Sequence, residues 1–146
     1  MSAATVPVVL IAEDDDAHAE LIARSLESSE CACDARRVSD GDEALDYLFR
    51  RGGYADANAS PAPQLVILDL RLPRVGGVQV LAEMRADRRL RRVPVVVLTT
   101  SEAPGDIAAA YDAGASSYVV KPSGLGELRA LMRALGDYWL CWNRRG

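Results

Sequence analysis

Short continuous runs of apolar residues alternate along this chain with longer segments whose apolar positions recur at helical spacing. Continuous apolar runs are typical of strands buried on both faces of a parallel sheet, and they predict strands at 6–12, 65–70, 94–98 and 116–120, with a weaker strand at 32–38. Helical spacing predicts helices at about 16–28, 42–51, 78–86, 104–113 and 125–142. Strands that alternate with helices in this way imply an α/β fold, an open parallel sheet covered by helices on both faces.

One segment between the predicted elements has no apolar period. Residues 52–64 (GGYADANASPAPQ) are rich in Gly, Ala and Pro, so we expect a surface loop inserted between a helix and a strand. The 146 residues of the chain correspond to one domain of ordinary size, and we expect a single domain over 1–146.

Composition narrows the class of protein. Apolar residues make up 49% of the chain and charged residues 26%, which is typical of a globular domain. The formal net charge of −4 argues against a nucleic-acid-binding module. No apolar stretch is long enough to span a membrane, and the first residues (MSAATVP) do not form a secretory signal, so we expect a cytoplasmic protein without membrane contact.

The cysteine pattern also fits a cytoplasmic protein. The chain has three cysteines, Cys31, Cys33 and Cys141, one close pair and one distant member. An odd count with this spacing is not typical of a disulfide framework or a zinc site. We therefore expect all three to be reduced, structural thiols.

Polar residues follow four of the predicted strands at their carboxyl ends. They are Glu13 and Asp14, Asp69, Thr99, and Lys121, in chain order. Neighbouring strands of a parallel sheet lie about 4.8 Å apart, so these ends should meet at one edge, where ligands of such sheets bind. The chain has sixteen arginines but one lysine, Lys121, and a compact ammonium differs from the broad guanidinium fork.

The residue types expected at this edge of the sheet indicate the chemistry of the site. Three crowded carboxylates repel one another unless a cation is present, and Mg²⁺ prefers oxygen ligands of this kind. An aspartate can also attack a phosphoryl group and form an aspartyl phosphate, while Lys121 and Thr99 stabilise the phosphoryl oxygens. Each residue taken alone has a structural interpretation, as a helix cap or a turn. The whole set at one edge favours phosphoryl chemistry.

These residues also resemble a known family, the receiver domains of two-component response regulators, over about 6–138. The motif set comprises Glu13-Asp14, Asp69, Leu72-Pro73, Gly77, Thr99 and Lys121-Pro122. The intervals of 30 residues from Asp69 to Thr99 and 22 from Thr99 to Lys121 fit the family's layout. The resemblance implies a flavodoxin-like, doubly wound, five-stranded parallel sheet with strand order 2-1-3-4-5.

The resemblance assigns roles to individual residues. Asp69 would accept the phosphoryl group from a sensor histidine kinase, and Thr99 and Lys121 would hold its oxygens. The ligands of Mg²⁺ would be Glu13, Asp14, Asp69 and the backbone carbonyl of Arg71. Thr99 and Tyr118 would form the switch, and Arg71 and Ser101 would tune dephosphorylation. The protein would then be a phosphoacceptor that promotes its own phosphotransfer and dephosphorylation, not an enzyme with a separate substrate.

A narrower likeness concerns partners. The loop 52–64, the segment 98–103 (LTTSEA) and the segment 138–143 (YWLCWN) resemble stand-alone receivers that partner phytochrome-type histidine kinases. The signal would leave through a target protein or through onward phosphotransfer. An apolar stripe on the last helix predicts a homodimer interface at Leu135, Tyr138, Trp139 and Trp142, although the two tryptophans could instead cap the domain's own core.

Three other functions fit parts of the pattern. A metal-dependent phosphohydrolase would need a second Asp at the position of Arg71. A flavin- or nucleotide-binding module would need a Gly-rich or hydroxyl-rich loop after the first strand, where this chain has acidic residues instead. A receiver that only docks to partners, without accepting phosphate, remains the main alternative.

Overall fold

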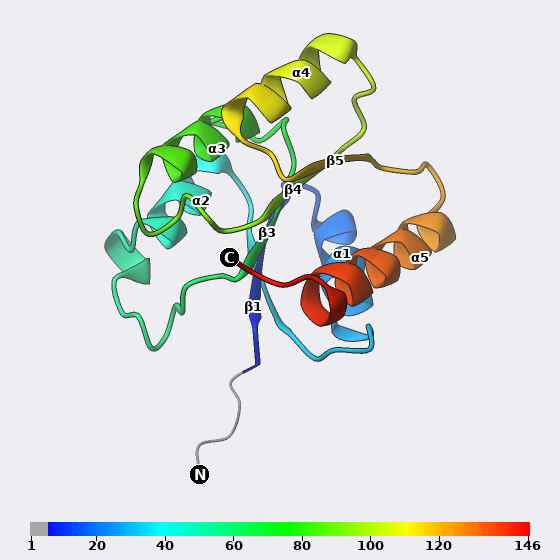
Figure 1. The fold of residues 1–146 in the computed structure, drawn as a ribbon, viewed down its shortest axis with the longest axis horizontal. Helices are drawn as coiled ribbons and strands as arrows, with labels where there is room; N and C mark the ends of the chain where they lie inside the picture. Colours follow the sequence, from blue (N-terminus) through cyan, green and yellow to red (C-terminus); the bar gives the residue numbers. More distant parts are fainter. Residues whose placement is uncertain (1–5) are drawn as a thin grey trace.

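The computed structural model describes residues 6–146, and it contains one five-stranded parallel sheet (Figure 1). The strands are β1 (Val8–Ala12), β2 (Asp34–Val38), β3 (Leu65–Leu68), β4 (Val95–Thr99) and β5 (Ser117–Val120). The helices are α1 (Asp16–Glu27), α2 (Gly41–Leu48), α3 (Gly77–Ala86), α4 (Pro104–Ala113) and α5 (Leu125–Gly136). The order across the sheet is β2-β1-β3-β4-β5, so the predicted fold and strand order are confirmed.

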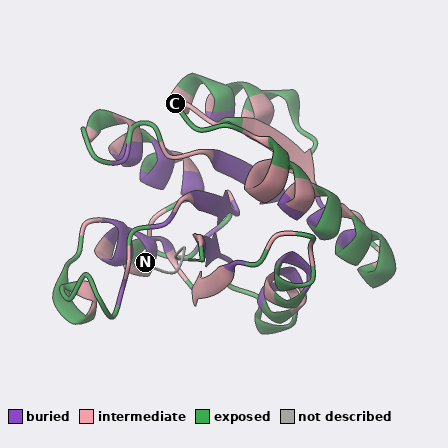
Figure 2. Cartoon of the chain, turned by 60° about the horizontal axis from the view of Figure 1, so that its bottom comes forward, coloured by how far each residue is buried: buried purple, intermediate pink, exposed green. Residues whose placement is uncertain are grey.

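Helices cover both faces of the sheet, with α1 and α5 side by side on one face and α2 and α3 on the other (Figure 1). Alternate residues of β1 divide between the two layers. Val9 and Ile11 pack in the cluster under α1 and α5, and Leu10 and Ala12 pack under α2 and α3. The central strands are therefore buried on both sides (Figure 2), which explains their continuous apolar runs. Among residues 6–146, no helix is long and apolar enough to cross a membrane.

Helix ends follow local capping rules in two cases and break the sequence prediction in a third. The Asp15 carboxylate accepts a hydrogen bond from the His18 N–H and begins α1, and Gly114 ends α4 in a left-handed conformation with φ of 109°. Helix α2, expected to continue to residue 51, ends at Leu48. Arg50 has a φ of 56°, which a helix cannot accommodate.

The segment 52–64 begins with a short 3-10 helix, Gly52–Tyr54, and is tied to α2 by two tyrosines. The Tyr54 hydroxyl donates to Glu43 Oε2 at 2.5 Å, and the Tyr47 hydroxyl donates to the Pro61 carbonyl at 2.7 Å. The Glu43 bond and burial together raise the pKa of Tyr54 to about 12, with burial as the larger cause. This segment therefore has fixed contacts with the body of the domain.

The expectation for the cysteines is wrong. Cys31, which follows α1, and Cys141, near the carboxyl end of the chain, are joined in a disulfide with their Cα atoms 5.7 Å apart. The two lie 110 residues apart in sequence, and only the packing of α1 against α5 brings them together. Of the three cysteines, Cys33 alone has a free thiol, and it is buried.

Cys33 should be a slow nucleophile. Burial raises the pKa of its thiol to about 11, aided by the charges of Glu27 and Asp34. Because the thiolate is the reactive form, alkylation of the folded, oxidised protein at pH 8 should be about a hundredfold slower than that of an ordinary thiol. Mass spectrometry after timed iodoacetamide exposure measures this rate.

The raised pKa of Cys33 also affects stability. It favours folding below the thiol's ordinary pKa of 9.0, a contribution lost as the pH rises through about 11. Alkylation at the rate of the denatured protein would contradict both statements.

Candidate phosphoryl-transfer site

The carboxyl ends of four strands meet at one edge of the sheet and form what we call the acidic site, made of Glu13, Asp14, Asp69, Thr99 and Lys121. Backbone hydrogen bonds fix the register there. The Asp69 N–H donates to the Ala12 carbonyl at 3.1 Å, and the Lys121 N–H donates to the Thr99 carbonyl at 2.7 Å. The site residues therefore stand on neighbouring strands of a buried sheet.

Lys121 lies between two carboxylates. Its Nζ donates to Glu13 Oε1 and, at 3.0 Å, to Asp69 Oδ2, and its side chain is only 5% exposed. Burial lowers the pKa of Lys121, but the hydrogen bond to Glu13 and the charge of Asp69 outweigh this effect and leave the pKa above its ordinary value. The lone lysine is thus a charged group held against the acidic residues, as the sequence indicates.

Glu13, Asp14 and Asp69 form a cluster in which one carboxylate oxygen from each lies within 4.8 Å of the others. Glu13 and Asp69 are buried, whereas Asp14 is exposed, so the cluster opens to solvent on the Asp14 side. Burial raises the pKa of Glu13 even though the hydrogen bond from Lys121 acts in the opposite direction. Crowded oxygen ligands of this kind fit a hard divalent metal ion, which would relieve their repulsion.

Thr99 carries a buried hydroxyl that finds no hydrogen-bond partner within residues 6–146, and the residue has no exposed surface. A buried, unpaired hydroxyl costs free energy, and such a group usually serves a ligand or a functional state. It stands at the end of β4, whose neighbours in the sheet are β3 and β5, the strands that precede Asp69 and Lys121. The Thr99 hydroxyl therefore lacks a hydrogen-bond acceptor among residues 6–146, and an anionic oxygen of a ligand would supply one.

The remaining candidate residues form a chain of contacts over the loop that follows β4. The Tyr118 hydroxyl donates to the Ser101 carbonyl at 2.8 Å, and the Ser101 hydroxyl donates to Asp106 Oδ2 at 2.5 Å. The exposed Arg71 guanidinium lies 3.6 Å from the same Asp106 oxygen, and the Arg71 N–H donates to Asp69 Oδ1 at 3.1 Å. Sequence reasoning missed Asp106, which joins both residues expected to tune dephosphorylation. Its position in the first turn of α4 was the one available signal.

Close packing behind Asp69 depends on a glycine, and this gives a stability prediction. A Cβ added at Gly77 would lie 2.4 Å from the Asp69 carbonyl oxygen and 2.8 Å from the Leu70 Cα. We expect Gly77→Ala to lower the free energy of unfolding by about 2 kcal/mol, because the backbone beside Asp69 must shift. Gly76→Ala is the matched control, since its nearest heavy atom would lie at an ordinary 3.7 Å. Urea denaturation of both variants measures the difference, and equal stabilities would refute the packing argument.

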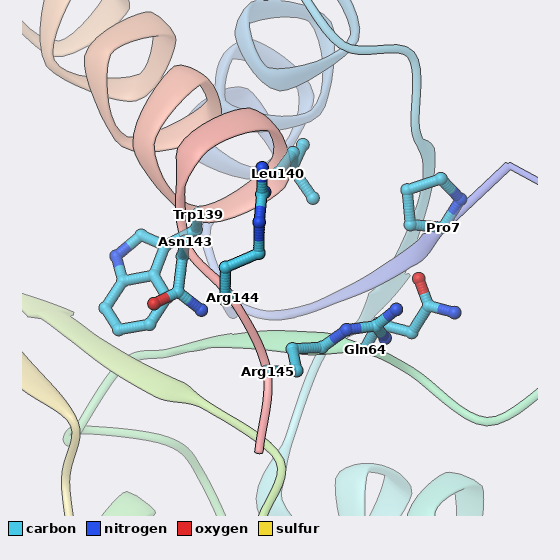
Figure 3. Close-up of a pocket in the computed structure, with 7 residues that line it drawn as sticks. All are labelled: Pro7, Gln64, Trp139, Leu140, Asn143, Arg144 and Arg145. Atoms are coloured by element: carbon cyan, nitrogen blue, oxygen red, sulfur yellow. The ribbon is translucent and has the colours of Figure 1, made fainter.

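The expected interface residues divide into two kinds. Tyr138 and Trp142 are exposed, whereas Leu135 and Trp139 are half-buried against the core cluster under α1 and α5. Figure 3 shows an open pocket at the amino-terminal edge of the sheet, in which Trp139 lies at one end and Pro7 at the other; its remaining lining residues are Gln64, Leu140, Asn143, Arg144 and Arg145. This pocket shares no residue with the acidic site.

The fold and the acidic site together define a CheY-like protein, a flavodoxin-type parallel sheet with an acidic, lysine-bearing carboxyl edge. The profile of the response regulator receiver domain matches residues 9–133, and the chain belongs to that family.

Several curated proteins and solved structures are similar to this chain over most of its length. The probable methanogenesis regulatory protein FilR2 of Methanothrix harundinacea is 41% identical over 94% of this chain and 86% of its own. The response regulator Rcp1 of Synechocystis is 35% identical over 91% of this chain and 88% of its own. Among solved structures, the phosphorylated cyanobacterial phytochrome response regulator RcpA superposes with a TM-score of 0.90 at 35% identity, covering 97% of this chain and 99% of RcpA. This likeness places the chain in two-component signalling, beside phytochrome-linked regulators.

Proposed function

We propose that the chain accepts a phosphoryl group on Asp69 from a sensor histidine kinase and so acts as a receiver in a two-component phosphorelay. The observation that carries this proposal is the Lys121 ammonium 3.0 Å from Asp69 Oδ2, together with the buried hydroxyl of Thr99 on the adjacent strand, which has no hydrogen-bond partner within residues 6–146. A carboxylate, a fixed cation and a free hydroxyl donor are the groups that acceptance of a phosphoryl group requires.

The metal of the site is proposed to be Mg²⁺, held by Glu13, Asp14, Asp69 and the backbone carbonyl of Arg71. Support comes from the three clustered carboxylates and from a solved Mn²⁺-bound form of a response regulator Rcp1, which superposes with a TM-score of 0.88 at 34% identity and covers 96% of this chain and 99% of that one. When bound, the ion neutralises negative charge on the transferring phosphoryl oxygens.

The chain's own residues then divide the reaction between them. An Asp69 carboxylate oxygen forms the new bond to phosphorus as the bond from phosphorus to the donor breaks. Lys121, already bonded to Asp69 Oδ2, turns its ammonium towards the added phosphoryl oxygens, and the Thr99 hydroxyl donates to one of them. Both groups stand at strand ends of the same sheet edge as Asp69 before the reaction.

The consequence of phosphorylation is proposed to travel through Thr99 and Tyr118. Tyr118 already reaches the loop after β4 through its bond to Ser101, so movement of Thr99 towards the phosphoryl group would displace the loop to which the ring is attached. Ser101 and Arg71 would tune phosphate loss, held in place by Asp106. The protein would be a signalling phosphoprotein that promotes its own dephosphorylation, not an enzyme with a separate substrate.

The partners are proposed from the same likeness. The kinase would be of the phytochrome type, the compartment the cytoplasm, and the outlet a target protein or a second phosphotransfer step, with no role for nucleic acid or membrane. One domain would span 1–146. Residues 1–5 lie outside the described part of the structure, so the expected absence of a secretory signal there stays a prediction.

A homodimer is proposed on the carboxyl-terminal helix, residues 125–142. An open, mostly apolar hollow lies there. Its lining includes Val119, Leu131, Leu135, Tyr138 and Trp139, of which Tyr138 is exposed. Aromatic and aliphatic groups of this kind are enriched at interface cores. Sedimentation equilibrium at tens of micromolar should show a dimer, and a monomer at that concentration would reject this arrangement.

The proposed function is tested with a small-molecule phosphodonor. The protein is incubated with acetyl phosphate and Mg²⁺, and its intact mass is recorded. We expect the gain of one labile phosphoryl group, which EDTA prevents. A receiver that only docks to partners would show no gain with acetyl phosphate or with a panel of purified phytochrome-type histidine kinases, and that result would overturn the proposal.

A further inference from the structure

The disulfide between Cys31 and Cys141 joins two segments that lie far apart in the sequence. Cys31 lies between α1 and β2, and Cys141 lies in the final turn, the π-helical segment Asp137–Trp142 that continues α5. The closed loop spans 110 residues. The bond therefore fixes the carboxyl-terminal end of the domain to its amino-terminal half.

Both sulfur-bearing residues are reachable from solvent. Cys31 and Cys141 are half-buried and line an open hollow together with Glu30, Asp137, Trp142 and Arg144. The partly exposed position beside an open hollow lets a second thiol approach the bond, which thiol–disulfide exchange requires.

The final turn has few other contacts. None of its residues is fully buried, although Trp139 and Leu140 pack partly against the core. Its beginning is held by Asp137 Oδ1, which accepts from the Glu30 N–H at 2.9 Å, and by the close packing of Gly136 on Ser29. Its end carries Cys141 and Trp142, whose indole is 76% exposed. The disulfide is thus the covalent attachment of the half of the turn that bears Trp142, beside the partial packing of Leu140.

We propose that Cys31 and Cys141 form a reversible redox site that takes a dithiol reductant and controls the order of the final turn. A thiolate of the reductant attacks one sulfur and forms a mixed disulfide, and the other cysteine leaves as a thiolate that takes up a proton. The second thiol of the reductant then resolves the mixed disulfide. Two electrons and two protons pass to the protein, and the reductant leaves as its own disulfide.

The biological use of this redox site depends on the proposed cytoplasmic location, because cytosolic disulfides are usually transient or redox-sensing. Its physical content is independent of phosphorylation. In the oxidised state the exposed Trp142 is held beside the α1–β2 loop, and in the reduced state the turn from Tyr138 onwards is free to move. The aromatic surface proposed for the dimer would then be presented in full only by the oxidised protein.

The test compares the full chain after treatment with oxidised glutathione and after treatment with dithiothreitol. Alkylation under denaturing conditions followed by intact mass should count one free thiol in the first sample and three in the second. Hydrogen–deuterium exchange of peptides covering 137–142 should be roughly tenfold faster or more in the reduced sample. Cys31→Ser should reproduce the fast exchange in both samples, whereas Cys33→Ser should leave the difference intact.

Two results would overturn the proposal. Three free thiols after oxidation would show that the bond does not form, and equal exchange of 137–142 in the two samples would show that it does not hold the turn. Circular dichroism establishes that Cys31→Ser is folded, which we expect because neither bonded cysteine belongs to the core. Uptake of a phosphoryl group from acetyl phosphate, measured on the same samples, reports separately on the proposed function.

Discussion

Asp69→Asn is expected to abolish the gain of a phosphoryl group from acetyl phosphate while leaving the domain folded. The amide keeps the shape of the side chain and one oxygen for the Lys121 ammonium, which also retains Glu13 as a partner. It lacks the anionic oxygen that attacks phosphorus. Because the change also removes one of three crowded carboxylates, the free energy of unfolding in EDTA should change by less than about 1 kcal/mol. Intact mass and urea denaturation measure the two effects.

The control for this variant is Asp112→Asn. Asp112 lies exposed on α4, and its substitution removes the same charge without touching the acidic site. It should accept the phosphoryl group as the unaltered protein does. If Asp69→Asn still gained a phosphoryl group, the acceptor would have to be another carboxylate, and Asp14 would be the first to examine because it is the exposed member of the cluster.

Much of the fold could be predicted because its signals are local. The run 94–98 became β4 at Val95–Thr99, since a strand buried on both faces needs apolar residues at every position. Helix α4 begins at Pro104 and ends before Gly114 as predicted, because Pro and Gly fix the backbone by their own covalent structure. The early end of α2 could not be predicted, since the positive φ of Arg50 has no signature in that residue's type.

The acidic site was predictable for a different reason. Parallel topology alone brings strand ends together, so Asp69 and Lys121 could be placed side by side before any contact was known. Other features of the structure depend on tertiary contacts, which have no local signal in the sequence. The disulfide needs α1 and α5 to pack, and Arg85, which donates to the carbonyls of Gly114 and Val93, is one arginine among many in the sequence.

Lys121→Met should both slow phosphorylation and destabilise the domain. The Met side chain fills a similar volume but carries no charge, so no fixed cation faces the phosphoryl oxygens. We expect phosphoryl uptake on Asp69 to slow by about two to three orders of magnitude. In EDTA, Glu13 and Asp69 would be left buried without a cation, and removing one partner of such a group costs about 3 kcal/mol of unfolding free energy.

Magnesium separates the two roles of Lys121. The proposed metal ligands are the same carboxylates, so Mg²⁺ should restore part of the stability of Lys121→Met and should bind this variant more tightly than the unaltered protein. It should not restore the rate, because the ion would not replace the fixed ammonium that Lys121 holds beside Asp69. Arg129→Met, on the exposed face of α5, is the control and should change neither quantity. Stopped-flow phosphorylation in saturating Mg²⁺ measures the rate, and urea denaturation with and without Mg²⁺ measures the stability. A full phosphorylation rate for Lys121→Met in saturating Mg²⁺ would mean that Lys121 serves only to offset the acidic residues, and its assignment to the phosphoryl oxygens would then be wrong.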